Sequence, residues 1–244
     1  MIRRIDNKTM GRGIHSWLNS IHHFSFADYY NPDNIQFGVL RVVNDDLVEA
    51  GEGFDIHPHQ NMEIISYVVN GELTHGDSMG NKSALKRGEA QYMSAGSGVW
   101  HSEHNFGKDV LRFLQIWILP DGDGYKPNYG DFRFKWEDRE NKWLAVAAST
   151  KNADSKAPIK IRADVNVYAA FIKKGKNLAF EVAKNRQAYL VLIEGKASIN
   201  KTDMNDRDAL EIVEEDIAVT TDSFAHVIVF EMAKPKPFEY ETDA

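Results

Sequence analysis

The amino-acid sequence predicts an all-β protein with the architecture of a β-sandwich or β-barrel. Segments with the period of an amphipathic helix are scarce, and short runs rich in β-branched and aromatic residues occur instead. Turn-forming Gly and Asn residues separate these runs at close spacing, which is typical of sandwiches and barrels. The expected strands are residues 37–43, 63–69, 111–119, 143–147, 165–171, 188–193 and 226–232, with turns at 70–71, 79–81, 87–89, 96–98, 121–124 and 194–195.

Length and composition limit the classes of protein to which the chain can belong. Its 244 residues suit one large all-β domain or two ordinary domains, and 43% of them are hydrophobic, which is enough for a packed core. The net charge of −7 argues against direct binding to nucleic acid or to an anionic membrane, because both need clustered Lys and Arg. A protein partner remains compatible with this charge.

The residue types and segments that are missing from the sequence narrow the prediction further. The chain has no cysteine, so disulfides, thiolate metal sites and a Cys nucleophile are excluded. The N-terminal segment is charged and has no apolar stretch of the signal-peptide type, and no run of about 18 apolar residues predicts a membrane span. We therefore expect a cytoplasmic protein without a membrane partner, and we expect it to be a monomer.

A connecting segment, residues 120–141, divides the chain into two halves that resemble each other. The segment combines Pro, Gly and charged residues with five aromatic rings, which predicts a strap packed across a domain surface. At an offset of 124 residues the rhythm of strands and turns repeats, with His57 opposite Glu181 and His59 opposite Ala183. An accidental likeness of two hairpins is the alternative. If the repeat is real, one half carries a site and the other is scaffold.

Two short motifs supply ligands for a metal ion. His57 and His59 flank a proline, and His101 and Glu103 flank a serine. Side chains at i and i+2 on a β-strand face the same side of the sheet, so two such strands can bring all four together. Three imidazoles and one carboxylate suit Fe(II), Mn, Ni, Cu or Zn, and four protein ligands leave two positions of an octahedral ion open. Ligand type alone does not separate these metals.

The segments around these motifs also carry a family resemblance. The first reads HPHQNME at residues 57–63, and the second reads SAGSGVWHSE at residues 94–103. They resemble the two motifs of cupin proteins, with Ser94 where the second motif has Pro and two extra residues before His101. In combination they closely resemble the pirin family of bicupins. The resemblance is strong over residues 1–120 and weak over the remainder.

This resemblance implies a fold and a set of ligands. Pirins have two cupin β-barrel domains in a bicupin arrangement, which implies a metal-binding domain at 1–125 and a cupin-like domain without metal ligands at 126–244. The three His and one Glu of the family correspond to His57, His59, His101 and Glu103. The implied ion is a single Fe(II) or a related metal. The Glu of the first cupin motif, Glu63, is then a supporting residue and not a ligand.

The resemblance also implies an activity. Some bacterial pirins are similar to quercetin 2,3-dioxygenases, so the chain is expected to be an oxidoreductase that cleaves the ring of a small aromatic substrate, a flavonol. Glu103 is then a candidate general base for the substrate hydroxyl. The alternative is a regulator without catalysis, whose metal reports redox state to a protein partner such as a transcription factor or a metabolic enzyme.

Two further histidines are candidate pocket residues. His75 follows the turn at 70–71 and is expected to face the barrel interior, although a solvent-facing strand position explains it equally well. His22 lies in an aromatic-rich stretch and is expected at the mouth of the barrel, with a packing role as the alternative. His104 alternates away from His101 and is expected to face outward.

Overall fold

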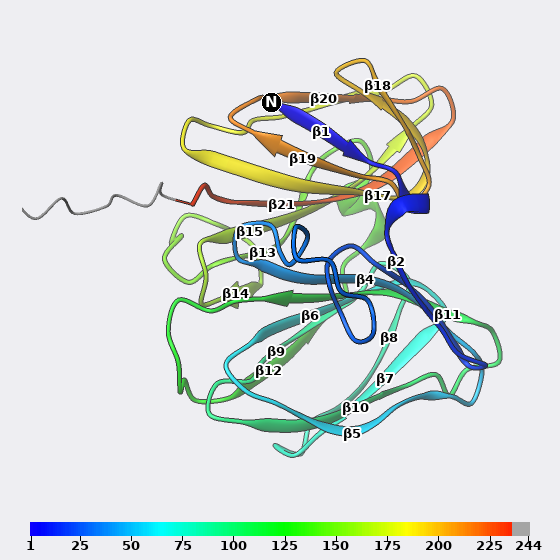
Figure 1. Cartoon of the computed structure of the whole chain (residues 1–244), viewed down its shortest axis with the longest axis vertical. Helices are drawn as coiled ribbons and strands as arrows, with labels where there is room; N and C mark the ends of the chain where they lie inside the picture. Colours follow the sequence, from blue (N-terminus) through cyan, green and yellow to red (C-terminus); the bar gives the residue numbers. More distant parts are fainter. Residues whose placement is uncertain (236–244) are drawn as a thin grey trace, which may run out of the picture.

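The computed structural model describes residues 1–235 and confirms the predicted all-β class. Two β-barrels lie one above the other, with the N-terminal half below and the C-terminal half above in Figure 1. The helices of the described part are two 3-10 turns, η1 (Asn7–Thr9) and η2 (Trp136–Arg139). No helix within residues 1–235 is long and apolar enough to cross a membrane. The predicted C-terminal domain ends at residue 244, and its residues 236–244 lie outside the described part.

The N-terminal barrel is built from two sheets. The larger has the strand order β12-β9-β6-β11-β4-β3-β2, and the smaller has the order β5-β10-β7-β8. All of their pairings are antiparallel. The strands are β2 (Gly11–Ile14), β3 (Leu18–His22), β4 (Leu40–Val48), β5 (Gly53–His59), β6 (Glu63–Asn70), β7 (Glu72–Asp77), β8 (Lys82–Lys86), β9 (Ala90–Ser94), β10 (Val99–His104), β11 (Leu111–Ile118) and β12 (Asn128–Phe132).

The C-terminal barrel is one continuous network of strands. Its main path has the order β1-β19-β17-β21-β15-β13-β14, and β16, β18 and β20 complete a second face. The strands are β1 (Ile2–Ile5), β13 (Leu144–Ser149), β14 (Ile159–Ile161), β15 (Val165–Lys173), β16 (Asn177–Phe180), β17 (Arg186–Ile199), β18 (Thr202–Asn205), β19 (Ala209–Val213), β20 (Ile217–Thr220) and β21 (Phe224–Ala233).

The two barrels have corresponding strand orders, which supports the internal repeat. The run β12-β9-β6-β11-β4 corresponds to β1-β19-β17-β21-β15, and β5-β10-β7-β8 corresponds to β16-β20-β17-β18. The edge strands are exchanged, because β1 from the chain start pairs with β19 and β12 from the connector pairs with β9. Each half, if divided at residue 125, therefore begins with a strand that pairs with the other half. The division into 1–125 and 126–244 stays a prediction.

Each of the seven expected strands overlaps an observed strand, and one predicted turn is wrong. Residues 194–195 do not end a strand, because β17 runs through them as far as Ile199. The register against β21 shifts between Leu192 and Glu194, and Gly195 has a φ of +94°. This β-bulge bends the strand, so its first part pairs with β19 and β21 and its second part with β18 and β20. Gly195 therefore lies at a bend within β17 and not at a turn between two strands.

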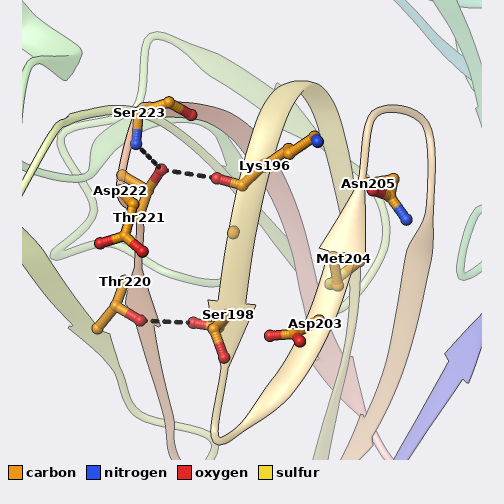
Figure 2. A pocket seen from close by; sticks show the side chains of 10 residues that line it. Lys196, Ser198, Asp203, Met204, Asn205, Thr220, Thr221, Asp222 and Ser223 are labelled. Atoms are coloured by element: carbon orange, nitrogen blue, oxygen red, sulfur yellow. Dashed lines mark hydrogen bonds between the residues drawn. The ribbon is translucent and has the colours of Figure 1, made fainter.

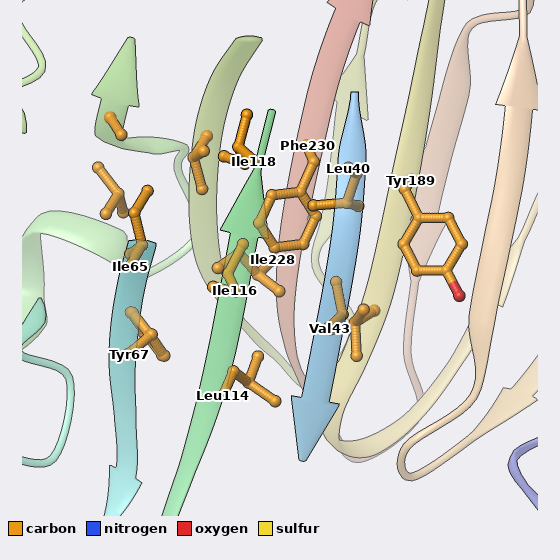
Figure 3. Close-up of a cluster of buried hydrophobic side chains, with 14 of the residues drawn as sticks. Leu40, Val43, Ile65, Tyr67, Leu114, Ile116, Ile118, Tyr189, Ile228 and Phe230 are labelled. Atoms are coloured by element: carbon orange, nitrogen blue, oxygen red, sulfur yellow. The ribbon is translucent and has the colours of Figure 1, made fainter. Parts of the chain in front are cut away.

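The two barrels share a hydrophobic core, which forms where their larger sheets face each other (Figure 3). On β11, Leu114 and Ile116 belong to this shared core, while Phe113 and Trp117 belong to clusters inside the N-terminal barrel. Because both faces of β11 are covered, its sequence is almost continuously apolar instead of alternating. The core side chains labelled in Figure 3 are Leu40, Val43, Ile65, Tyr67, Leu114, Ile116, Ile118, Tyr189, Ile228 and Phe230.

Candidate metal centre

Three of the predicted ligands meet inside the N-terminal barrel. His57 and His59 lie on β5, and His101 lies on the neighbouring strand β10, directly opposite His57 in the antiparallel register. One ring nitrogen from each of the three histidines lies within 4.8 Å of the others. The ring centroids of His57 and His101 are 4.5 Å apart, and those of His59 and His101 are 4.9 Å apart. The i, i+2 spacing read from the sequence therefore does place both β5 histidines on one face.

Glu103 lies beside this trio. A register shift between His101 and Glu103 places Glu103 opposite Phe54 on β5 and opposite His75 on β7. Glu103, His75 and His101 form a second group whose ligand atoms lie within 4.8 Å of one another. His101 is the member that both groups share. Glu103 is not part of the compact trio, so the bulge sets it at the side of the histidine cluster.

The histidines have the protonation and the free nitrogens that a metal requires. Burial, reinforced by His57, lowers the pKa of His101 to about 3. Burial, reinforced by His101, lowers the pKa of His59 to about 4, so both rings are neutral at neutral pH. Both ring nitrogens of His101 are buried without a hydrogen-bond partner. His57 Nδ1 lies 2.7 Å from the Asp55 carbonyl oxygen, which leaves Nε2 as the free nitrogen. The residues present fit a divalent metal ion.

Three neutral side chains hold the Glu103 carboxylate in place. Ser66 Oγ donates to its Oε1 at 2.6 Å, and Gln91 Nε2 donates to the same oxygen at 2.8 Å. Gln115 Nε2 donates to its Oε2. These donors come from three adjacent strands, β6, β9 and β11, and so limit how far the carboxylate can turn. Partners of this kind orient a metal ligand and tune its affinity.

The donors to Glu103 belong to a single row of polar residues that crosses the larger sheet. The strand registers pair Gln91 with Ser66, Ser66 with Gln115, Gln115 with Asn44 and Asn44 with His22. These five residues are called the polar row below. Inside a barrel such positions are ordinarily apolar, and apolar side chains do flank the row, with Phe113 in one cluster and Trp117 in the other. The row therefore marks a specialised strip of the barrel wall.

Beyond Gln115 the polar row borders a cavity of about 260 Å³. This inner cavity lies close to the lower limit of about 300 Å³ for ordinary small-ligand pockets, and aromatic rings line one part of it. An outer cavity shares Leu18, His22, Phe26 and Phe54 with it and extends toward Arg12, His15 and Asp28. The residues lining the inner cavity are Leu18, Ser20, His22, Phe26, Asn44, Asp46, Phe54, His57, His59, Glu103, Gln115 and Trp117.

The structure also places the three predicted supporting residues. His75 is buried, its Nε2 lies 3.1 Å from Asp77 Oδ2, and its ring stacks on Tyr129 at 4.4 Å, as expected for an interior position. His22 is buried and lines both cavities, which is the expected place at the barrel mouth.

Glu63 is not brought to the cluster. It belongs to neither group of ligand atoms, and its Oε1 accepts a hydrogen bond at 2.7 Å from Ser94 Oγ, which also receives one from Arg162 Nη1 of the other half. The adjacent residue Ile64 packs inside the barrel, so the alternation along β6 turns Glu63 toward the other face. Burial raises the pKa of Glu63, partly offset by Ser94 and Arg162.

The sequence reasoning missed several residues of this site, above all Asp46. Asp46 lies on β4, is only 3% exposed and lines the inner cavity. Burial raises the pKa of its carboxyl to about 7; the approach of Ser20 Oγ, which makes no hydrogen bond of normal geometry, offsets part of that rise. A signal was present, because Asn44, Asp45 and Asp46 interrupt a strand that is otherwise apolar except for Arg41.

The C-terminal barrel has a cavity of a different kind (Figure 2). It measures about 430 Å³ and is lined mainly by Lys, Asp, Asn, Ser and Thr residues of β17, β18, the end of β20 and the segment after it, with no histidine. Thr221 Oγ1 donates to the Lys196 carbonyl at 2.7 Å, and Thr220 Oγ1 donates to the Ser198 carbonyl at 3.0 Å. The cavity thus has no counterpart of the histidine cluster.

Comparisons with known proteins identify the family of this chain. Residues 4–118 match the family model described as Pirin, and residues 146–232 match the model described as Quercetinase C-terminal cupin domain. The chain is 38% identical over 224 residues to the quercetin 2,3-dioxygenase of Escherichia coli K12, covering 91% of this chain and 94% of that protein. It is 40% identical over 221 residues to a pirin-like protein of Caulobacter vibrioides, covering 91% and 94%.

The comparison with solved structures also identifies a pirin. The bacterial pirin YhhW of Escherichia coli, crystallised in complex with nickel(II), superimposes with a TM-score of 0.88 at 36% identity. The match covers 96% of this chain and 100% of that one. With both halves matched by family models and the fold shared end to end, this chain belongs to the pirin family of two-domain cupin proteins.

Proposed function

We propose that this chain holds one divalent metal ion, preferentially Fe(II), through His57, His59, His101 and Glu103, and that it is a dioxygenase that opens the ring of a flavonol. Two lines of support come from relatives, one named quercetin 2,3-dioxygenase and one crystallised with nickel(II). The class of reaction, an oxidoreductase acting on a small aromatic substrate, follows from the named relatives. Fe(II) and flavonol are the finer parts of the proposal.

The observation that carries the proposal is the state of His101. His101 is 1% exposed, and neither of its ring nitrogens has a hydrogen-bond partner, although His57 and His59 lie beside it. An unsatisfied buried donor or acceptor costs about 1–3 kcal/mol, so such a cluster is unfavourable unless something binds it. A metal ion satisfies all three imidazoles at once and releases this penalty.

The residues of the chain prepare the cavity for an aromatic substrate. When bound, the metal would supply Lewis acidity and a place for dioxygen or a substrate oxygen. Phe26, Phe54 and Trp117 give the inner cavity apolar walls that suit a planar ring system. The Glu103 side chain, held by three donors, supplies a fixed oxygen ligand beside the histidines. Because the inner cavity is small and these side chains line much of it, a bound flavonol would displace water from it.

The proposal is tested by turnover with defined metals. The metal is removed with a chelator, the protein is reloaded with Fe(II), Mn, Ni, Cu or Zn, and quercetin is added in air. Loss of flavonol absorbance together with matching oxygen uptake is expected, most strongly with Fe(II), and none is expected from the metal-free protein. Stoichiometric metal binding without turnover by any of the five ions would contradict the dioxygenase proposal and favour a regulator that binds a protein partner.

A further inference from the structure

The polar row is satisfied at one end and unsatisfied at the other. Toward β9 its donors bind Glu103, whereas toward β3 the atoms Asn44 Oδ1 and His22 Nδ1 have no hydrogen-bond partner. Ser20 Oγ, next to His22 on the same face of β3, has none either. The three side chains are only 1–4% exposed. Buried polar groups in native proteins are nearly always paired, so this end of the row indicates a ligand that pairs with it.

Asp46 completes this unsatisfied end. It lies two residues beyond Asn44 on the same face of β4 and directly opposite Ser20 in the register. Within residues 1–235 no salt bridge reaches its carboxylate, and Ser20 is the neighbour that partly offsets its raised pKa. Its neighbour Asp45, in contrast, has the cationic partner that is usual for a buried carboxylate. Asp45 points to the opposite face, where Arg112 Nη2 lies 2.7 Å from its Oδ2. Asp46 is therefore a buried carboxylate that faces the cavity without a cation beside it.

Other titratable groups share the cavity with Asp46 from each wall. They are His22 on β3, His57 and His59 on β5, and Glu103 on β10. After burial, the charges of Asp45 and Glu103 contribute to the raised pKa of Asp46. A cavity carboxyl that resists ionisation accepts a proton more readily than an ordinary aspartate, which suits a general base.

We propose that Ser20, His22, Asn44 and Asp46 form the subsite that binds the acidic hydroxyl of the substrate, and that Asp46 accepts its proton. The inference rests on the proposed function and replaces Glu103, the base expected from the sequence. In this step the O–H bond of the phenol or enol breaks and its electron pair stays on the substrate oxygen. The proton bonds to an Asp46 carboxylate oxygen, so the residue becomes a neutral acid. Glu103 keeps its hydrogen bonds from Ser66, Gln91 and Gln115.

The variant Asp46→Asn tests the inference in two measurements on Fe(II)-loaded protein. Without oxygen, bound quercetin is titrated by its absorbance, and the variant is expected to ionise it only at a higher pH than the unmodified protein does. In air, kcat is expected to fall by about 10²–10⁴-fold, the usual contribution of a general base. Metal content by elemental analysis is expected to stay the same. Asp109→Asn, the same change at an exposed site of this barrel, is the control and should behave as the unmodified protein.

The outcomes separate this inference from the proposed function. Flavonol that binds and ionises without oxygen uptake contradicts the dioxygenase proposal alone and leaves the subsite intact. Unchanged ionisation and unchanged kcat in Asp46→Asn overturn the inference alone. Absence of any flavonol binding by the loaded protein overturns both. If the substitution Asp46→Asn prevents folding, which thermal unfolding would reveal, Asp46→Ser is measured in the same way.

Discussion

The two barrels have corresponding strand orders, yet their interiors differ in one row of residues. In the N-terminal barrel four adjacent strands place four of the five residues of the polar row side by side, whereas the corresponding strands of the C-terminal barrel place mostly apolar side chains there. Three of the C-terminal residues are fully buried. The N-terminal row reads Gln91, Ser66, Gln115 and Asn44, and its C-terminal counterpart reads Leu210, Leu190, Val229 and Tyr168.

This difference separates the interior that mainly stabilises the fold from the interior that carries the candidate site. The C-terminal interior is one large apolar cluster, which contributes the hydrophobic free energy of an ordinary core. The N-terminal interior is divided into two small clusters on either side of the polar row and the histidines. The shared core between the barrels supports both halves. The polar site reduces the apolar packing inside the N-terminal barrel. The C-terminal interior and the shared core between the barrels therefore supply much of the stability of the whole fold.

The largest effect is expected from removing the histidine that joins both ligand groups. His101→Ala should abolish metal binding, because His101 is common to the two clusters, and should leave the fold in place. Elemental analysis and far-UV circular dichroism measure the two results. His104→Ala is the matched control, since His104 lies on the same strand and stacks on Phe106 away from the cluster. Metal content that survives in His101→Ala would contradict the ligand assignment.

A second change makes one position of the polar row resemble the C-terminal barrel. Gln115→Val removes the donor to Glu103 Oε2 and installs the residue type of position 229. Metal affinity is expected to fall by about 10–100-fold, the usual effect of losing a partner that orients a ligand. A competition titration against a chelator of known affinity measures it. An unchanged affinity would mean that the row does not serve the metal ligands.

The reciprocal change introduces polarity into the C-terminal interior. Val229→Gln buries an amide among Leu190 and the other apolar residues of that barrel, where nothing pairs with it. The free energy of unfolding is expected to fall by about 1–3 kcal/mol, the cost of an unsatisfied buried polar group. Denaturant unfolding measures this loss, and the metal affinity should not change. Equal stability would show that the C-terminal interior does not need its apolar row.

The smallest effect concerns the contact between the barrels. Burial raises the pKa of Glu194, but hydrogen bonds from His226 and Arg87 outweigh it and lower the pKa to about 2. The ionised Glu194 side chain therefore stabilises the folded protein above pH 4.5, and this stabilisation is lost as the pH falls toward 2. In Glu194→Gln the unfolding free energy lost between pH 4.5 and pH 2 should be smaller by about 1 kcal/mol. The effect is no larger because solvent screens the partly exposed Arg87. Identical slopes in both proteins would rule out the contribution.

Much of the fold was predictable because strands and turns are local features. The runs 63–69, 111–119 and 165–171 each coincide with an observed strand, since β-branched and aromatic residues bounded by Gly turns favour extended backbone. The bulge at Gly195 was predicted as a turn, because a glycine with positive φ occurs in both. The exchanged edge strands β1 and β12 were missed, since pairing between distant segments leaves no local pattern.

The candidate site was predictable to a similar extent. The histidines of β5 and β10 could be expected together from i, i+2 spacing and from the pirin motifs. Glu63 was expected beside them, but the alternation of β6 turns it away, while Asp46 was missed. Asp46 comes from β4, which lies outside both motifs. Its place in the cavity depends on the register of β3, β4 and β11.

The sequence by itself determined the class of fold, the residue types at the metal centre and the half of the chain that carries them. Local geometry suffices for this, because alternation on a strand is a property of consecutive residues. Only the tertiary structure decided which polar residues form one row, which end of that row is satisfied by Glu103, and which carboxylate faces the cavity. These relations depend on strand registers, which bring residues from distant parts of the chain to within a hydrogen bond of one another.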